Sequence, residues 1–158
     1  MTGRLEVSRM KARIDATFER GKALAKNADF ETQADFARYL CILVSGYLEK
    51  SVAELVLEHS RKHGGPTLQR YVERTTHRFT NANCQKIKEL LGGFNPDWKV
   101  KLDQVLVDEY KDAVDGLVAL RNEIAHGGPG GITTRRVTDY YLRIQKVVDE
   151  IADLCAPT

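Results

Sequence analysis

The sequence predicts an all-α protein, a helical bundle of four or five main helices with short extra helices. Apolar residues recur at intervals of three and four along most of the chain, which is the spacing of one helix face. No segment shows a convincing alternation of apolar and polar residues, the pattern of a half-buried strand. Clusters of glycine, proline and asparagine interrupt the pattern where helices can end. Because 158 residues suit one domain with its own core, we expect a single helical domain over residues 1–158.

The first part of the chain predicts two helices. Residues 5–26 place a few apolar side chains loosely at helical spacing among many charged ones. Residues 27–29 break this segment, and either Asp29 or Thr32 can cap the helix that follows. Residues 30–61 carry the strongest apolar stripe, so we expect them to form a long helix at the centre of the bundle.

Two short helices are expected in the middle of the chain. The Gly-Gly-Pro run at residues 64–66 ends the long helix, and a short helix follows over residues 66–79, since proline suits a first turn. A second short helix then extends to the two glycines at residues 92–93. Residues 94–98, which include Pro96, predict a turn.

The last part of the chain predicts two longer helices with a loop between them. Apolar residues mark the buried face of the first helix over residues 105–124. The Gly/Pro-rich run at residues 127–131 indicates a flexible loop and not a domain linker, because another helix follows it. Thr133 or Thr134 can cap that final helix, whose apolar pattern repeats cleanly to Leu154.

Composition and charge limit the functions that the chain can have. Lys and Arg number 24 against 22 for Asp and Glu, a net charge of +2, so any RNA-binding surface must come from local clustering. The three cysteines lie far apart and lack zinc-site spacing, which favours a reducing cytosol over a disulfide framework. The sequence shows no signal-peptide pattern and no apolar run of the roughly 18 residues that a membrane span needs. We therefore expect a cytoplasmic protein that does not interact with a membrane.

The most distinctive chemistry lies in the stretch LRNEIAHG, residues 120–127. Arg121 has a permanent charge and a fork of donors that fits phosphate, and His126 belongs to the residue type that titrates near neutrality. On a helical wheel Arg121 lies about 40° from Leu117, inside the apolar stripe, so its charge needs a carboxylate, a phosphate or a wet cleft. His126 lies about 140° from Arg121, so an undistorted helix does not bring both to one small group.

Two interpretations of this stretch remain open. In a structural one, Arg121 pairs with a carboxylate such as Glu49, and His126 is an ordinary cap at the helix end. In a functional one, the helix unwinds before Gly127, and His126 contacts Asn122, which lies four residues earlier on the same face. An Arg and a His at this spacing are too common for spacing alone to decide between the two.

The string LRNEIAHG, late in an all-helical chain, resembles the motif of the HEPN superfamily, in which Arg is followed after four to six residues by His. The residue after Arg is polar in that motif and often Asn, and Asn122 fits. In detail the chain is most similar to the RiboL-PSP-HEPN group. The run GYLEKSV at residues 46–52 looks like part of the second helix of these domains, and the final helix after a glycine loop also fits. Residues 66–92 look like an insertion or elaboration that has no match in the group.

The resemblance implies a metal-independent endoribonuclease that needs no cofactor. Such domains are commonly homodimers whose Arg–His elements meet across the interface. By position, Arg121 would neutralise the scissile phosphate, and His126 would move the proton of the attacking 2′-hydroxyl or the leaving 5′-oxygen. Asn122 would orient His126 or the phosphate. The products would be a 2′,3′-cyclic phosphate and a 5′-hydroxyl, and the need for a 2′-hydroxyl would restrict the substrate to RNA.

The resemblance also implies the biological settings and an alternative function. The enzyme would be a toxin or defence effector or an RNA-processing factor, with an antitoxin or a nucleotidyltransferase as its partner. The alternative is a non-catalytic module that keeps the fold and binds RNA, a nucleotide or another protein. The presence of both Arg121 and His126 favours the enzyme.

Two basic clusters could guide RNA, although a solvated helix face explains each of them as well. Arg135, Arg136 and Arg143, together with Lys146, could steer phosphates from the final helix toward His126. The middle helices carry a second cluster, in which interleaved aromatic residues could stack on the bases of single-stranded RNA. Its members are Arg70, Tyr71, Arg74, His77, Arg78, Phe79, Lys86 and Lys88.

One histidine pair has the spacing of metal ligands on a helix. His59 and His63 lie four residues apart, on one face. No glutamate or third ligand is placed to complete a site, and the segment is a charged helix end. We expect no metal site.

Overall fold

The computed structural model describes residues 3–128 and 131–156, and within them the chain forms seven helices and no strand. The prediction of an all-α fold is confirmed. The helices are α1 (Gly3–Ala25), α2 (Phe30–His63), α3 (Pro66–His77), α4 (Cys84–Phe94), α5 (Pro96–Val105), α6 (Asp108–Ala125) and α7 (Thr134–Leu154).

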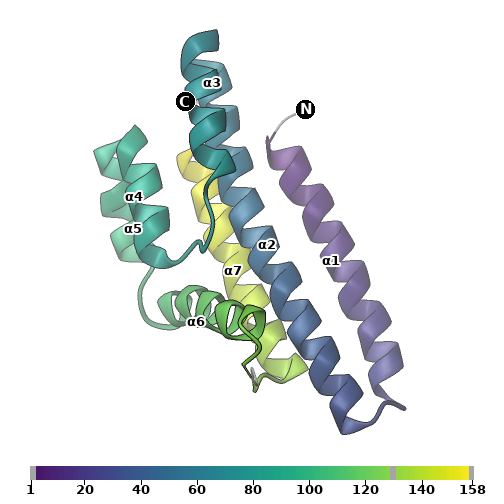
Figure 1. The fold of residues 1–158 in the computed structure, drawn as a ribbon. Helices are drawn as coiled ribbons and strands as arrows, with labels where there is room; N and C mark the ends of the chain where they lie inside the picture. Colours follow the sequence, from purple (N-terminus) through teal and green to yellow (C-terminus); the bar gives the residue numbers. More distant parts are fainter. Residues whose placement is uncertain (1–2, 129–130, 157–158) are drawn as a thin grey trace.

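The long helix α2 is the centre of the bundle (Figure 1). It packs against α1 on one side and against α7 on the other, and α6 runs across α2 and α7. The short helices α4 and α5 pack against each other beside α6 and α7, and α3 lies against the C-terminal end of α2. The end of α6, where the LRNEIAHG stretch lies, therefore sits far from α3 along the length of α2.

The core follows the apolar stripes that the sequence predicts. In α2 a continuous row of side chains is fully buried, at spacings of three and four. The row consists of Leu40, Val44, Leu48, Val52 and Leu55. In α7 the corresponding buried row is Val137, Tyr141, Ile144, Val148 and Ile151. These two rows face each other and hold the two longest apolar surfaces of the chain together.

Tyr141 joins three helices at the centre of this packing. Its ring stacks on Phe18 of α1 at 5.1 Å between centroids and meets Tyr47 of α2 edge-on at 5.8 Å. Its hydroxyl donates a hydrogen bond to Asp15 of α1 at 2.8 Å. Burial, followed by this hydrogen bond to a carboxylate, raises the pKa of Tyr141. The aromatic contacts and the satisfied hydroxyl fix α1 against α2 and α7.

Two predicted boundaries in the middle of the chain are wrong. Residues 94–98 do not form a turn, because α4 extends to Phe94 and α5 begins at Pro96. Asn95 alone joins the two helices: its side chain accepts the backbone N–H of Asp97 at 2.9 Å, and Pro96 fits the first helical position.

The second wrong boundary is the start of the helix predicted over residues 105–124, which forms but begins three residues later. Helix α5 ends at Val105 and α6 begins at Asp108, which has a φ of 49°. Aspartate adopts this left-handed conformation more readily than most residues. The break turns the chain, so α6 crosses α7 instead of continuing the direction of α5.

Side-chain caps also begin three further helices besides α5. Asp29, Asn83 and Thr133 each accept a backbone N–H from the residue three positions on, at 2.7, 2.9 and 3.2 Å. Pro129 and Gly130, in the middle of the predicted loop, lie outside the described residues. In the described part of the chain, no helix combines the length and the apolarity that crossing a membrane requires.

Candidate functional site

The chain turns sharply at the end of the Arg–His stretch. Gly127 has a φ of 77°, its N–H donates to the Ile124 carbonyl at 3.1 Å, and the N–H of Gly128 donates to the Glu123 carbonyl at 2.8 Å. These two bonds, with a left-handed glycine between them, form a Schellman motif. The motif stops α6 and fixes His126 as its C-cap residue, with an exposed side chain.

Arg121 is half-buried near the same helix end. Its Nη1 donates to the Oδ1 of Asn122 at 3.4 Å, a long hydrogen bond. Among residues 3–128 and 131–156, no carboxylate forms an ion pair with Arg121. The suggested partner Glu49 instead accepts the backbone N–H of Asn81 at 2.9 Å. The Arg121–Glu49 pair of the structural interpretation is therefore not formed, and the guanidinium keeps most of its donors for a ligand.

The structure brings Arg121 and Asn122 together but does not add the imidazole of His126 to them. The backbone N–H of His126 donates to the Asn122 carbonyl at 3.0 Å, which completes the last helical turn. Among the described residues, no hydrogen bond joins the side chains of Asn122 and His126, and the Asn122 Oδ1 accepts from Arg121 instead. The imidazole forms no hydrogen bond with the described residues and is exposed, so it is open to a ligand or a second chain.

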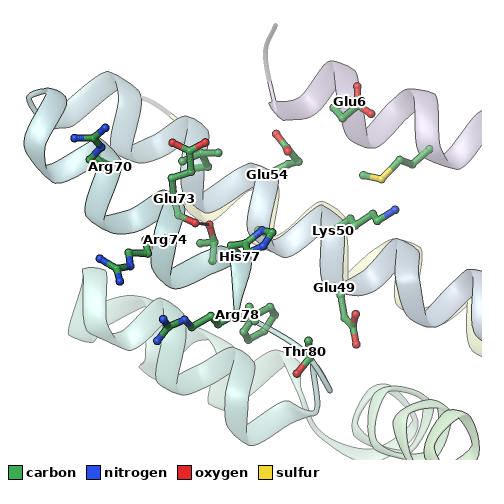
Figure 2. Close-up of a pocket in the computed structure, with 15 residues that line it drawn as sticks. Glu6, Glu49, Lys50, Glu54, Arg70, Glu73, Arg74, His77, Arg78 and Thr80 are labelled. Atoms are coloured by element: carbon green, nitrogen blue, oxygen red, sulfur yellow. Dashed lines mark hydrogen bonds between the residues drawn. The ribbon is translucent and has the colours of Figure 1, made fainter. Parts of the chain in front are cut away.

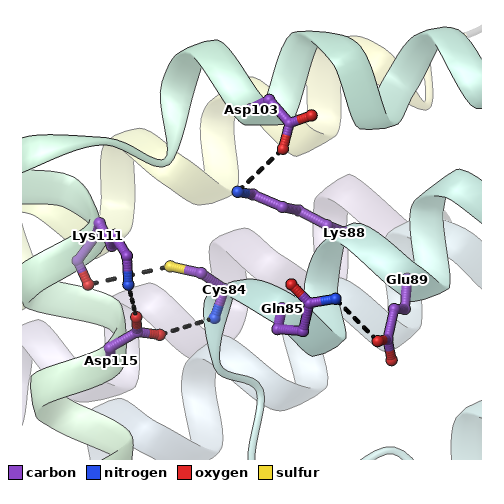
Figure 3. A network of polar contacts seen from close by, with 7 residues as sticks. All are labelled: Cys84, Gln85, Lys88, Glu89, Asp103, Lys111 and Asp115. Carbon is purple, nitrogen blue, oxygen red and sulfur yellow. Dashed lines mark hydrogen bonds and ion pairs between the residues drawn. The ribbon is translucent and has the colours of Figure 1, made fainter.

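A polar cavity of about 400 Å³ borders the Asn122 side of α6. Lys88, Lys111 and Asp115 also line it. Figure 3 shows that both lysines are already paired, Lys88 with Asp103 at 3.0 Å and Lys111 with Asp115. Lys111 and Asp115 carry no sequence signal for this pocket, because a pocket built from α4 and α6 depends on contacts between residues far apart in sequence.

The Asp115 carboxylate also accepts the backbone N–H of Cys84 at 2.9 Å. Partial burial of Asp115 acts to raise its pKa, but the hydrogen bonds from Lys111 and Cys84 outweigh burial, and the pKa is lowered. Burial and the nearby carboxylate raise the pKa of the Cys84 thiol to about 12. Cys84 is therefore a protonated, buried thiol and not a nucleophile.

Of the three arginines predicted on the final helix, one has a defined role in packing. The Nε of Arg136 donates to the Tyr140 hydroxyl at 3.1 Å, and the guanidinium lies 5.4 Å from the centre of the same ring. A side chain at Gly116 of α6 would come within 2.8 Å of this hydroxyl, so Arg136 sits at the α6–α7 contact. Arg135 is exposed and Arg143 is half-buried, and neither forms an ion pair among the described residues.

The histidine pair of α2 takes part in packing. The rings of His59 and His63 stack at 4.1 Å, and His59 meets Trp98 of α5 edge-on at 4.8 Å. Burial lowers the pKa of His59 and so favours the neutral ring. The described residues contain no group of three or more His, Cys, Asp or Glu side chains that could hold a metal ion.

A cavity of about 830 Å³ lies between α1, α2 and α3, away from the end of α6. Figure 2 shows Glu54 and Lys50 of α2 facing it, opposite Glu73 and His77 of α3. Because acidic and basic side chains are mixed in its lining, this cavity is neither strongly positive nor strongly negative.

Comparison with known proteins supplies independent information on the family. A family model described as RiboL-PSP-HEPN matches residues 9–156, which is nearly the whole described chain. Neither the curated proteins nor the solved structures give a match. The match covers both the bundle and the LRNEIAHG stretch.

Proposed function

The chain belongs to the RiboL-PSP-HEPN family, and from this membership we propose that it is a metal-independent endoribonuclease. The proposed site consists of Arg121, Asn122 and His126. One observation carries the proposal: Arg121 is half-buried and forms no ion pair with a carboxylate among the described residues. A partly desolvated guanidinium of this kind is stabilised by an anionic ligand, and an RNA phosphate supplies one.

In the proposed mechanism, Arg121 binds the scissile phosphate and neutralises the charge that develops on it. The 2′-hydroxyl of the preceding nucleotide attacks phosphorus, and the bond to the 5′-oxygen breaks. His126 takes the proton from the attacking hydroxyl or supplies one to the leaving oxygen. Asn122 positions the Arg121 side chain through their hydrogen bond. The products are a 2′,3′-cyclic phosphate and a 5′-hydroxyl.

The proposed site is shared between two copies of the chain. Among the described residues of one chain, no hydrogen bond joins the His126 side chain to Arg121 or Asn122, and the wheel positions of Arg121 and His126 differ by about 140°. A homodimer that pairs the ends of α6 lets the Arg121 of one copy face the His126 of the other.

The test is cleavage of labelled RNA by Arg121→Ala and His126→Ala. Removing a general acid–base group costs about 10²- to 10⁴-fold in rate, and we expect a loss of this size in both variants with unchanged helical content. His63→Ala and Arg13→Ala, which lie elsewhere on the bundle, serve as matched controls and should cleave as the wild type does. EDTA should not affect cleavage, and a 2′-deoxy nucleotide at the cut position should block it.

Two results contradict this proposal. Equal cleavage by the wild type and both variants would place the activity elsewhere, and loss of activity in EDTA would rule out the metal-free mechanism. Absence of cleavage, combined with RNA or nucleotide binding that needs Arg121, would support the non-catalytic alternative. The absence of a hydrogen bond between the His126 and Arg121 side chains within the described chain is the observation that favours that alternative.

The proposed settings are those of a toxin or defence effector, or of an RNA-processing factor, in the cytoplasm. The proposed partners are RNA and either an antitoxin or a nucleotidyltransferase. Induced expression of an active ribonuclease should inhibit growth, and His126→Ala should relieve this inhibition. If expression of the wild type and of His126→Ala inhibits growth equally, the toxin role is wrong.

A further inference from the structure

A groove of about 620 Å³ lies between α3 and α4, far from the end of α6. Its floor is apolar and includes Phe79, Leu90 and Phe94, which are half-buried and pack against the core. Tyr71 of α3 also lines the groove, and 68% of its surface is exposed. An exposed tyrosine beside two further aromatic rings provides flat surfaces on which planar ligands can stack.

A row of arginines follows the same helix. Arg78 lines the groove, whereas Arg70 and Arg74 line the neighbouring cavity between α1, α2 and α3. Arg70, Arg74 and Arg78 are spaced four residues apart, so their positions are separated by about 6 Å along the helix axis. Figure 2 shows the three side chains along one side of α3, whereas Glu73 and His77 point toward α2. The 6 Å spacing is of the order of the distance between consecutive phosphates of an extended single strand.

The arginines of this row are not neutralised within the chain. In the part of the chain that the structure describes, none of them forms an ion pair. Lys86, on the α4 wall of the groove, donates to the Thr80 carbonyl at 3.1 Å and also lacks a carboxylate partner. Among the residues that line the groove, Arg78 and Lys86 outnumber Glu89. Together with the other two arginines of the row, on the adjoining face of α3, they make this region favourable for a polyanion.

We propose that the α3–α4 groove and the adjoining face of α3 bind single-stranded RNA. Bases stack on Tyr71, and phosphates are held by Arg78 in the groove and by Arg70 and Arg74 beside it. The inference rests on the proposed function for its substrate class and adds a second contact site to it. A single strand fits better than a duplex, because only unstacked bases can reach an aromatic ring. The groove would hold substrate at one end of the bundle while the Arg–His element acts at the other.

The test measures binding of a fluorescein-labelled oligouridine by anisotropy, in the His126→Ala background so that no RNA is cut. Tyr71→Ala should weaken binding about tenfold, since stacking on one base contributes this much or more, and Tyr71→Phe should retain affinity. Arg70→Ala with Arg74→Ala should lower the slope of log affinity against log salt by about 1.4, for two lost phosphate contacts. Arg13→Ala with Arg20→Ala removes the same charge from α1 and should change neither quantity.

Three outcomes overturn this inference. If Tyr71→Ala binds the oligouridine as tightly as its parent does, the groove does not bind RNA and a protein is its more plausible partner. If Tyr71→Ala weakens the binding of duplex RNA as much as that of the single strand, bases do not stack on Tyr71. Loss of the dimer in Tyr71→Ala would show that a second copy covers the groove. Failure of the proposed catalysis is a separate result, because a wild type that does not cleave RNA leaves these binding measurements intact.

Discussion

Asp115 of α6 accepts the backbone N–H of Cys84 at 2.9 Å, so the helix that carries Arg121 also caps the first turn of α4 (Figure 3). Asn83 satisfies the N–H of Lys86 in the same turn. The start of α4 is thus fixed by one local cap and by one carboxylate from a distant helix. This junction bounds the polar cavity that Asn122 lines.

Asp115→Ala should therefore destabilise the protein by about 1–2 kcal/mol, because it leaves the Cys84 N–H without its acceptor. The measurement is the free energy of unfolding in urea. Asp112→Ala, an exposed aspartate on the same helix, is the matched control and should change stability little. If Asp115→Ala loses no more unfolding free energy than Asp112→Ala does, water accepts the Cys84 N–H in place of the Asp115 carboxylate.

The same carboxylate should make stability depend on pH. The pKa of Asp115 is lowered in the folded protein, so the charged form stabilises the fold above the unfolded value of about 4. That contribution is lost as pH falls through the lowered folded pKa. Asp115→Asn cannot titrate, and its unfolding free energy should fall less than that of the wild type between about pH 6 and pH 3. If the unfolding free energies of the wild type and of Asp115→Asn change with pH in parallel, Asp115 does not cause the pH dependence.

The sequence predicts the local features of the fold well, because they depend on neighbouring residues. The caps Asp29 and Thr133 and the helix stop at Gly127 follow from residue types at short spacing. The break near Asp108 could not be predicted, since it depends on how α6 packs across α7.

The candidate site shows the same division between local and distant contacts. Its residues and the helix end are found from the string itself, but the orientation of the Asn122 side chain is not. The Asp115–Cys84 contact joins residues 31 positions apart and leaves no periodic signal in the sequence.

Gly127→Ala should cost about 1–2 kcal/mol of stability, because a side chain is unfavourable at a φ of 77°. No atom would clash with the new methyl group, so the effect reports backbone strain alone. If His126 acts in catalysis, RNA cleavage should fall as well, since strain at the Schellman motif shifts the C-cap residue. Gly131→Ala is the control, as it has open space and no left-handed φ. Equal stability of the two variants would contradict the role of the motif.

Gly21→Ala should destabilise the contact between α1 and α2. The new methyl group would overlap the ring of Phe36, and this overlap should outweigh the gain of about 1 kcal/mol in helix propensity. A second substitution, Phe36→Leu, should recover part of the lost stability in the double variant. The measurement is a double-mutant cycle of unfolding free energies. If the two changes in unfolding free energy are additive, the new methyl group does not press on the Phe36 ring, and α1 and α2 move apart instead.

Mixing Arg121→Ala with His126→Ala protein tests whether the proposed site is shared. If each site takes Arg121 from one copy and His126 from the other, a mixed dimer has one intact site and one site lacking both groups. Random exchange makes half of the dimers mixed, so cleavage should return to about a quarter of the wild-type rate. If each site used both groups of the same chain, every site in a mixed dimer would lack one group, and no activity would return. The readout is cleavage of labelled RNA after subunit exchange, with each variant alone as the control for residual activity. Recovery must rise with the time allowed for exchange, because two variants that are mixed without exchanging subunits contain no intact site in either arrangement.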